Sequence, residues 1–215
     1  MESLSLYLFI SIAIPLISVA IVTKERTRTV SLFLLFGVTA GLFCGEINGL
    51  LSKIVTLSTR YYSVNIAPII EECVKAFPLI VYAFIKKPSR QRLLESSIVM
   101  GVGFAILENA FILANNIESI SLPLAIVRGV GAGLMHGVCT LAVGEGLDLV
   151  SHDKRIAVSG TLGLLGEAII FHSFYNNMIQ SKYAYFSFIL PFCVFIIIII
   201  KMKREEKDVE TKIQQ

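Results

Sequence analysis

The sequence predicts an all-α fold, a polytopic transmembrane helical bundle, and three observations lead to this class. Of the 215 residues, 55% are hydrophobic and only 16% are charged, and the mean hydropathy is +0.75. Runs of about 20 mostly apolar residues, the length that crosses a bilayer as a helix, follow one another along the chain. The loops between them are short, and we find no soluble domain and no internal repeat.

Seven stretches are predicted to span the membrane: residues 4–22, 30–51, 64–85, 96–117, 122–150, 156–179 and 184–200. The first follows "MES", without a positively charged region before it or a small-residue cleavage site after it, so we expect an uncleaved helix and no signal peptide. The fifth is long enough to tilt or to break. Residues 1–200 are therefore expected to form one transmembrane domain, and 201–215 a short charged cytoplasmic tail.

The distribution of lysine and arginine predicts the orientation of the bundle. With the N-terminus outside and the C-terminus inside, the inner segments 23–29, 86–95, 151–155 and the tail hold 14 of the 19 basic residues. Cytoplasmic loops are enriched in such residues, so this orientation is favoured over its inverse. The net charge of +3 follows from these loops and gives no reason to expect a nucleic-acid partner.

Four cysteines lie inside the apolar stretches, and no two of them form a C-x-x-C pair: Cys44, Cys73, Cys139 and Cys193. We expect them to be small buried apolar residues and expect no disulfide framework.

The third predicted span contains "IIEECVKAF", which places Glu71, Glu72 and Lys75 within five positions. A charged residue at the centre of a span costs roughly 2.5–3.5 kcal/mol of insertion free energy, so three of them require compensation or a function. Glu71 and Lys75 are four residues apart and share one helical face. Pro68 and Pro78 flank the group and are expected to bend or loosen this helix.

The next three spans carry further polar groups in the stretches "GFAILENA", "VRGVGAGLMHG" and "FHSFYN". The residues singled out are Phe104, Glu108, Asn109, Arg128, His136, His172 and Asn176. Glu71, Glu108 and His172 lie about 7–9 residues from the outer ends of their spans, or roughly 10–14 Å deep, and His136 is expected to lie deeper. Four helices are thus predicted to present carboxylate and imidazole groups to one outward-leaning cavity.

Purely structural interpretations of these residues stay open. The acids and the lysine of the third span can neutralise one another as an ion cluster, and His172 with Asn176 can form hydrogen bonds between helices. Arg128 is expected to be a structural counter-ion for one of the acids. Three other intramembrane acids are left out of the predicted site: Glu46, Glu145 and Glu167.

The residue types favour acid–base hydrolysis. Adjacent carboxylates in a poorly hydrated site differ in proton affinity, and such a pair can remove a proton from water and return one to a leaving amine. No serine or cysteine nucleophile with an evident base stands out, and H-E-x-x-H is absent. We expect no cofactor and no metal, although two glutamates and two histidines can also bind zinc.

Four motifs in order resemble those of the PrsW intramembrane proteases: "EECVK", "FAILEN", "RGVGAGLMH" and "HSFYN". These are glutamic-type enzymes related to the CAAX prenyl endopeptidases and to bacteriocin-processing membrane proteases. The resemblance covers about 64–177. In the wider CAAX-type relatives the first motif usually runs Glu-Glu-x-x-x-Arg, so Lys75 favours the PrsW branch.

The resemblance implies roles for the residues. Glu71 and Glu72 would supply the base that activates water, with Glu108 in support. His136, His172 and Asn176 would orient the water or stabilise the oxyanion. The expected supporting residues are Lys75, Phe104, Asn109 and Arg128.

The resemblance also implies a partner and a place. The substrate would be a membrane-anchored protein, such as a membrane-bound anti-sigma factor, cut first on the outer side. The expected location is the cell membrane, as a multi-pass protein in contact with the lipid bilayer. Two rivals stay open: a proton- or ion-coupled transporter using the same Glu/His cluster, and a scaffold without catalytic activity.

Overall fold

A computed structural model describes residues 27–116, 118–152 and 157–213. The described chain is helical throughout, which confirms the all-α class. The elements are α2 (Thr27–Ile54), α3 (Thr59–Asn65), α4 (Ala67–Lys86), α5 (Arg90–Asn115), α6 (Leu122–His152), α7 (Ala157–Ile179), the short 3-10 helix η2 (Ala184–Phe186) and α8 (Ile189–Ile213). The predicted span 4–22 lies outside the described residues.

Four segments are long and apolar enough to cross a membrane: Arg28–Ile54, Arg90–Asn115, Leu122–Ser151 and Ala184–Arg204. They match four of the predicted spans. The stretches predicted to span at 64–85 and 156–179 are also helical, as α4 and α7, but their polar residues set them apart from the four apolar segments. The chain is therefore a membrane protein with four candidate spans among its described residues.

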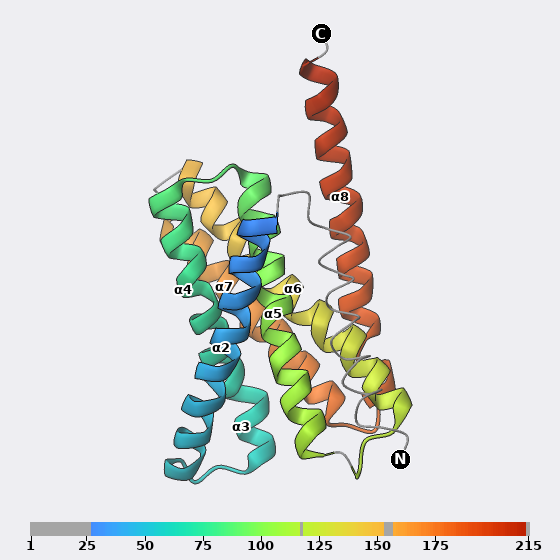
Figure 1. Ribbon diagram of the computed structural model, residues 1–215. Coiled ribbons are helices and arrows are strands. Elements are labelled where there is room, and N and C mark those ends of the chain that lie inside the picture. The colour runs from blue at the N-terminus through green and yellow to red at the C-terminus, as the bar shows by residue number, and fades with distance from the viewer. Residues whose placement is uncertain (1–26, 117, 153–156, 214–215) are drawn as a thin grey trace.

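The long helices run up and down in alternation, and α5 and α6 form the centre of the bundle (Figure 1). In the most apolar windows of α5 and α6, 61% and 83% of residues are buried, against 22% and 17% for the windows in α2 and α8. The outer helices therefore leave apolar side chains such as Leu42, Phe43 and Ile197 exposed, as lipid-facing surfaces do.

Local signals explain the bounds of α4. Pro68 lies in the first turn, where a missing backbone N–H removes no helical hydrogen bond. Lys87, with φ at 45°, ends the helix in a left-handed conformation and Pro88 follows. Pro78 lies inside α4, yet the helix runs continuously from Ala67 to Lys86. The expected loosening at the two prolines thus does not interrupt the helix.

The cysteines confirm the prediction in part. All four are free thiols; Cys44 and Cys139 are buried, as expected, whereas Cys73 and Cys193 are exposed. We expected Cys73 to be buried because it lies inside an apolar predicted span. It lies on the outer side of α4, where neighbouring Phe77 is also exposed.

Close packing of α2 on α5 depends on two glycines that face each other. A Cβ atom added at Gly37 would overlap the backbone carbonyl of Met100 and approach the Phe104 N–H, and one added at Gly103 would overlap the Leu34 carbonyl. Glycine pairs of this kind let helix backbones approach closely in membranes. By contrast, a Cβ atom added at Gly45, which is also on α2, would have no other atom within 4 Å.

This contrast predicts opposite effects for two identical substitutions on α2. Gly37→Ala should destabilise the bundle by about 1–3 kcal/mol, since backbone atoms cannot yield as a flexible side chain can. Gly45→Ala should be neutral or stabilising by up to about 1 kcal/mol through helix propensity. Thermal unfolding of both variants in the same detergent measures the difference. Equal melting temperatures would contradict the close approach of α2 and α5.

Candidate active site

Three of the four charged residues of α4 are buried in the bundle. Glu71 is 7% exposed, and Glu72 and Lys75 are completely buried. The Lys75 ammonium donates to Glu72 Oε1 across 2.7 Å, one helical turn apart. Lys75 was expected to share a face with Glu71; the structure pairs it most closely with Glu72 instead.

His172 on α7 faces both glutamates. Its Nδ1 lies 2.7 Å from Glu72 Oε1, and its Nε2 lies 3.7 Å from Glu71 Oε2. Glu72 accepts hydrogen bonds as the carboxylate partner of Lys75, so His172 donates its Nδ1–H to it. The lone pair of a neutral His172 is then on Nε2, beside Glu71.

His136 on α6 connects this group to α5. Its Nδ1 lies 2.9 Å from the Lys75 Nζ, and its Nε2 lies 2.9 Å from Glu108 Oε2. An ammonium has only donors, so Nδ1 accepts and the ring proton is on Nε2, directed at Glu108. The Arg128 guanidinium lies 3.9 Å from the same Glu108 oxygen.

His136 lies in contact with the other site residues, although its sequence position predicts a greater depth than theirs. The reason is the course of α6, which crosses the bundle obliquely (Figure 1). Residues counted along a tilted helix overestimate depth.

Phe104 and the two imidazoles surround the Lys75 ammonium. The Lys75 Nζ lies 4.8 Å from the centre of the Phe104 ring, within the range of a cation–π contact. The His136 ring is 4.8 Å from Phe104 and 4.7 Å from His172, centre to centre. Such surroundings exclude water and strengthen each electrostatic contact.

Two residues that the sequence interpretation missed complete the surroundings of Glu71. Asn48 on α2 donates its amide to Glu71 Oε1 across 3.3 Å, and the Tyr62 hydroxyl on α3 donates to the Asn48 oxygen across 3.0 Å. Burial, and then the Glu71 carboxylate, raise the pKa of the Tyr62 hydroxyl, so it remains a donor. The one available signal was the Asn48 carboxamide, two residues after Glu46 in a mostly apolar span.

Two of the predicted residues make their hydrogen bonds away from this cluster. The Asn176 amide donates to the Ser63 carbonyl across 2.9 Å and so ties α7 to α3. The Asn109 amide donates to the Arg128 carbonyl across 3.4 Å between α5 and α6.

The three acids left out of the predicted site also lie elsewhere. Glu145 pairs with Arg90 across 2.7 Å and with Lys201 across 3.6 Å. Glu46 and Glu167 are exposed on α2 and α7.

At the centre of the cluster, buried polar atoms lack a hydrogen-bond partner in the described protein, among them Glu71 Oε2, Glu72 Oε2 and His172 Nε2. An unsatisfied buried polar atom costs roughly 1–3 kcal/mol, so this arrangement favours a polar ligand between Glu71 and His172. Glu71, His136 and His172 each place one possible metal-ligand atom within 4.8 Å of the others. The arrangement suits activation of a bound water.

Residues 25–202 match the family model described as PrsW family intramembrane metalloprotease. The match covers most of the chain, which therefore belongs to the PrsW family of intramembrane proteases. A comparison with curated proteins gave no match, and a comparison with solved structures gave none.

The buried ion pair predicts strong coupling between its partners. Lys75→Met removes the cation closest to the buried Glu72 carboxylate. It should destabilise the protein by roughly 3–5 kcal/mol. Adding Glu72→Gln to Lys75→Met should recover part of this loss, because the uncompensated charge is then gone. Melting temperatures of the single and double variants in detergent give the coupling, with exposed Lys53→Met as the control. Additive effects would contradict the pairing.

Proposed function

We propose that this member of the PrsW family is a glutamic-type intramembrane endopeptidase that hydrolyses a peptide bond of a membrane-anchored protein. One observation carries the proposal. Glu71 Oε2 and His172 Nε2 are buried, lie 3.7 Å apart and have no hydrogen-bond partner in the part of the chain that the structure describes. A water held between them donates one hydrogen to each and directs its oxygen lone pairs towards a substrate carbonyl.

Glu71 is the proposed general base. It takes a proton from the water as the water oxygen bonds to the carbonyl carbon, which leaves a tetrahedral oxyanion. It then gives that proton to the departing amine as the C–N bond breaks, so it is regenerated as a carboxylate. His172 Nε2 accepts a hydrogen bond from the second O–H of the water and so fixes the direction of attack.

The other buried groups hold these two in position. Glu72 is engaged by both Lys75 and the His172 Nδ1–H, so it sets the His172 tautomer and is a poor base itself. His136 joins Lys75 to Glu108. We therefore divide the roles of the two adjacent glutamates: Glu71 reacts and Glu72 positions.

The two asparagines and Arg128 receive supporting roles. Because the Asn176 amide is bonded to the Ser63 carbonyl, we propose that Asn176 positions α3 at the edge of the site and does not hold the oxyanion. Arg128 serves as counter-ion to Glu108, and Asn109 fixes the backbone of α6 at Arg128.

The family description names a metalloprotease, and the donor set fits a metal only in part. Glu71 and His172 offer free ligand atoms, but both ring nitrogens of His136 are engaged, one by the Lys75 ammonium. A catalytic zinc takes three protein ligands. Glu72 Oε2 is also free, but Glu72 does not belong to the group of three residues whose ligand atoms lie within 4.8 Å of one another. Within that group only Glu71 and His172 have a free ligand atom and a lysine cation lies beside His136, so the residues favour water activation by glutamate without a metal.

We propose a topology of seven spans with the N-terminus outside and the C-terminus inside the cell membrane. Residues 1–200 would form the single transmembrane domain and residues 201–215 the cytoplasmic tail. Two features support it. The 87–89 connection, the end of α6 and the end of α8 lie at one end of the bundle, and α3 lies at the other (Figure 1). Among the described residues, the first of these ends holds the basic side chains of Arg28, Lys86, Lys87, Arg90 and Arg92, and cytoplasmic ends are enriched in such residues.

The substrate we propose is a single-span protein with an outer domain, such as a membrane-bound anti-sigma factor. Glu71 is the fifth residue of α4, and α4 begins at the end of the bundle that carries α3. The reacting groups thus lie near the proposed outer end, where a substrate helix leaves the bilayer. The transporter alternative predicts solute flux through the cluster and no cut protein, and membership of a protease family disfavours it.

Loss of the base should abolish cleavage. Glu71→Gln is expected to reduce the rate at least about 100-fold, since general bases contribute roughly 10²–10⁴-fold. The measurement compares membrane proteomes of cells with wild-type protein and with Glu71→Gln, scoring new extracytoplasmic termini. Glu167→Gln, an exposed acid on α7, is the matched control and should retain activity. Identical profiles for wild type and a folded Glu71→Gln variant would reject hydrolysis.

Chelation tests the proposed absence of a metal. Protein washed with EDTA is expected to cleave the protein found in that proteome comparison at an unchanged rate, because Glu71 and His172 activate water by themselves. Loss of activity with EDTA and recovery with added zinc would overturn the metal-free mechanism while leaving the protease function intact.

A further inference from the structure

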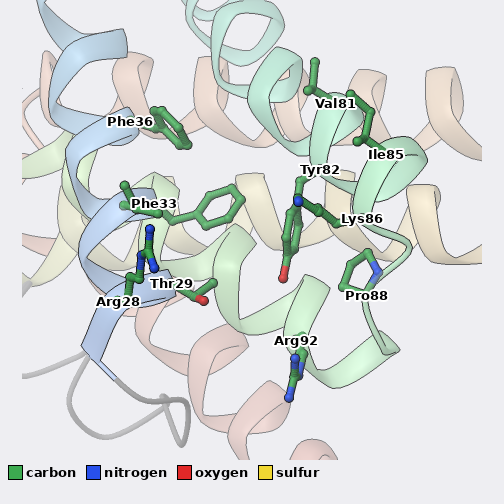
Figure 2. A pocket seen from close by; sticks show the side chains of 11 residues that line it. Arg28, Thr29, Phe33, Phe36, Val81, Tyr82, Ile85, Lys86, Pro88 and Arg92 are labelled. Atoms are coloured by element: carbon green, nitrogen blue, oxygen red, sulfur yellow. The ribbon is translucent and has the colours of Figure 1, made fainter.

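A pocket of about 690 Å³ lies between the start of α2, the end of α4 and the start of α5. Figure 2 shows Phe33 and Tyr82 facing each other between α2 and α4, with Arg28, Lys86 and Arg92 around them. On α4 the lining residues Tyr82 and Lys86 follow Lys75 by seven and eleven residues, or roughly 10–17 Å along the helix axis. The pocket is therefore separate from the proteolytic machinery.

The pocket has an apolar wall. The Phe33 and Tyr82 rings meet edge to face with centres 4.9 Å apart. Phe36, Val81 and Ile85 line the same space and are 41%, 41% and 70% exposed. An open apolar surface of this kind on a membrane helix suits a hydrocarbon chain.

The pocket also has a basic rim drawn from three helices. Arg28 is in the first turn of α2, Lys86 is the last residue of α4, and Arg92 is in the first turn of α5. The apolar residues lie deeper: Phe33 and Phe36 follow Arg28 by five and eight residues, or roughly 8–12 Å.

This rim coincides with the edge of the apolar spans. Two of the four apolar segments begin at Arg28 and Arg90, so the three cations lie where lipid headgroups begin. Guanidinium and ammonium groups bind phosphate oxygens well, and basic pockets between transmembrane helices bind anionic lipid headgroups.

We propose that this pocket binds one anionic phospholipid, with its phosphodiester at Arg28, Lys86 and Arg92 and an acyl chain along Phe33, Phe36 and Val81. Charge complementarity selects the anionic headgroup, and the apolar wall selects a lipid over free phosphate. The bound lipid bridges α2, α4 and α5 and so stabilises this end of the bundle.

The test uses the full chain purified in detergent, with dioleoyl phosphatidylglycerol or dioleoyl phosphatidylcholine added. Native mass spectrometry counts retained lipids, and thermal unfolding reports the stabilisation. Wild type is expected to retain one phosphatidylglycerol in preference to phosphatidylcholine and to melt at a higher temperature with it. Inorganic phosphate should not compete, because it lacks the acyl chain.

The variant Arg28→Gln/Lys86→Gln/Arg92→Gln should lose this preference, with affinity falling on the order of fivefold per residue removed. Lys53→Gln/Arg60→Gln/Lys182→Gln removes the same charge at the other end of the bundle and should behave as wild type. Each single substitution is measured too, and Arg28→Lys/Lys86→Arg/Arg92→Lys should retain the lipid, so misfolding of the triple glutamine variant leaves the test intact.

Three results would overturn the proposal. One is equal retention of the two lipids by wild type, and another is an equal loss of preference in both triple glutamine variants. The third is a stabilisation that depends on protein concentration and not on phosphatidylglycerol, which would place a second copy of the chain on this surface.

Discussion

The rest of the structure depends on one buried ion pair, formed by the Lys75 ammonium and the Glu72 carboxylate. Neither side chain is exposed to solvent. Removing both from water costs several kcal/mol per ion, and their attraction offsets that cost only with further hydrogen bonds. Those bonds come from His172 on α7 and His136 on α6, and Phe104 on α5 adds its ring face. The pair thus fixes the positions of three neighbouring helices relative to α4.

Close helix packing makes this arrangement possible. Gly101 faces the backbone carbonyl of His136, and an added Cβ there would overlap it. The Thr140 hydroxyl donates to the same carbonyl. The small residue lets α6 approach α5 closely enough for His136 to reach Lys75 and Glu108. The apolar centre therefore determines the polar geometry, because imidazole nitrogens must be placed within a few tenths of an ångström to bond on both sides.

The two ends of the bundle carry different groups of charged residues. In each case the bilayer, which solvates charges poorly, explains why these charges need partners. Near one end, the buried acids and imidazoles leave polar atoms available to a water, among them Glu71 Oε2 and His172 Nε2. At the other, Arg28, Lys86 and Arg92 surround an apolar pocket at headgroup level. Charges at the first end bind one another within the protein, and we propose that the cations at the second also bind a lipid phosphate.

Bilayer-length apolar runs and costly intramembrane charges are visible without a structure. The helical membrane class, the positions of the long described helices and the polar residues that four of them carry could therefore be predicted from the sequence alone. Which partner each polar side chain binds depends on how the helices pack, and this could be read only from the tertiary structure. It joined Lys75 to Glu72, turned Asn176 towards α3 and brought Asn48 to Glu71. It also left Cys73 on the outer surface. Helical periodicity gives the face on which a side chain lies, whereas the partner it meets depends on the tilt and approach of the neighbouring helices.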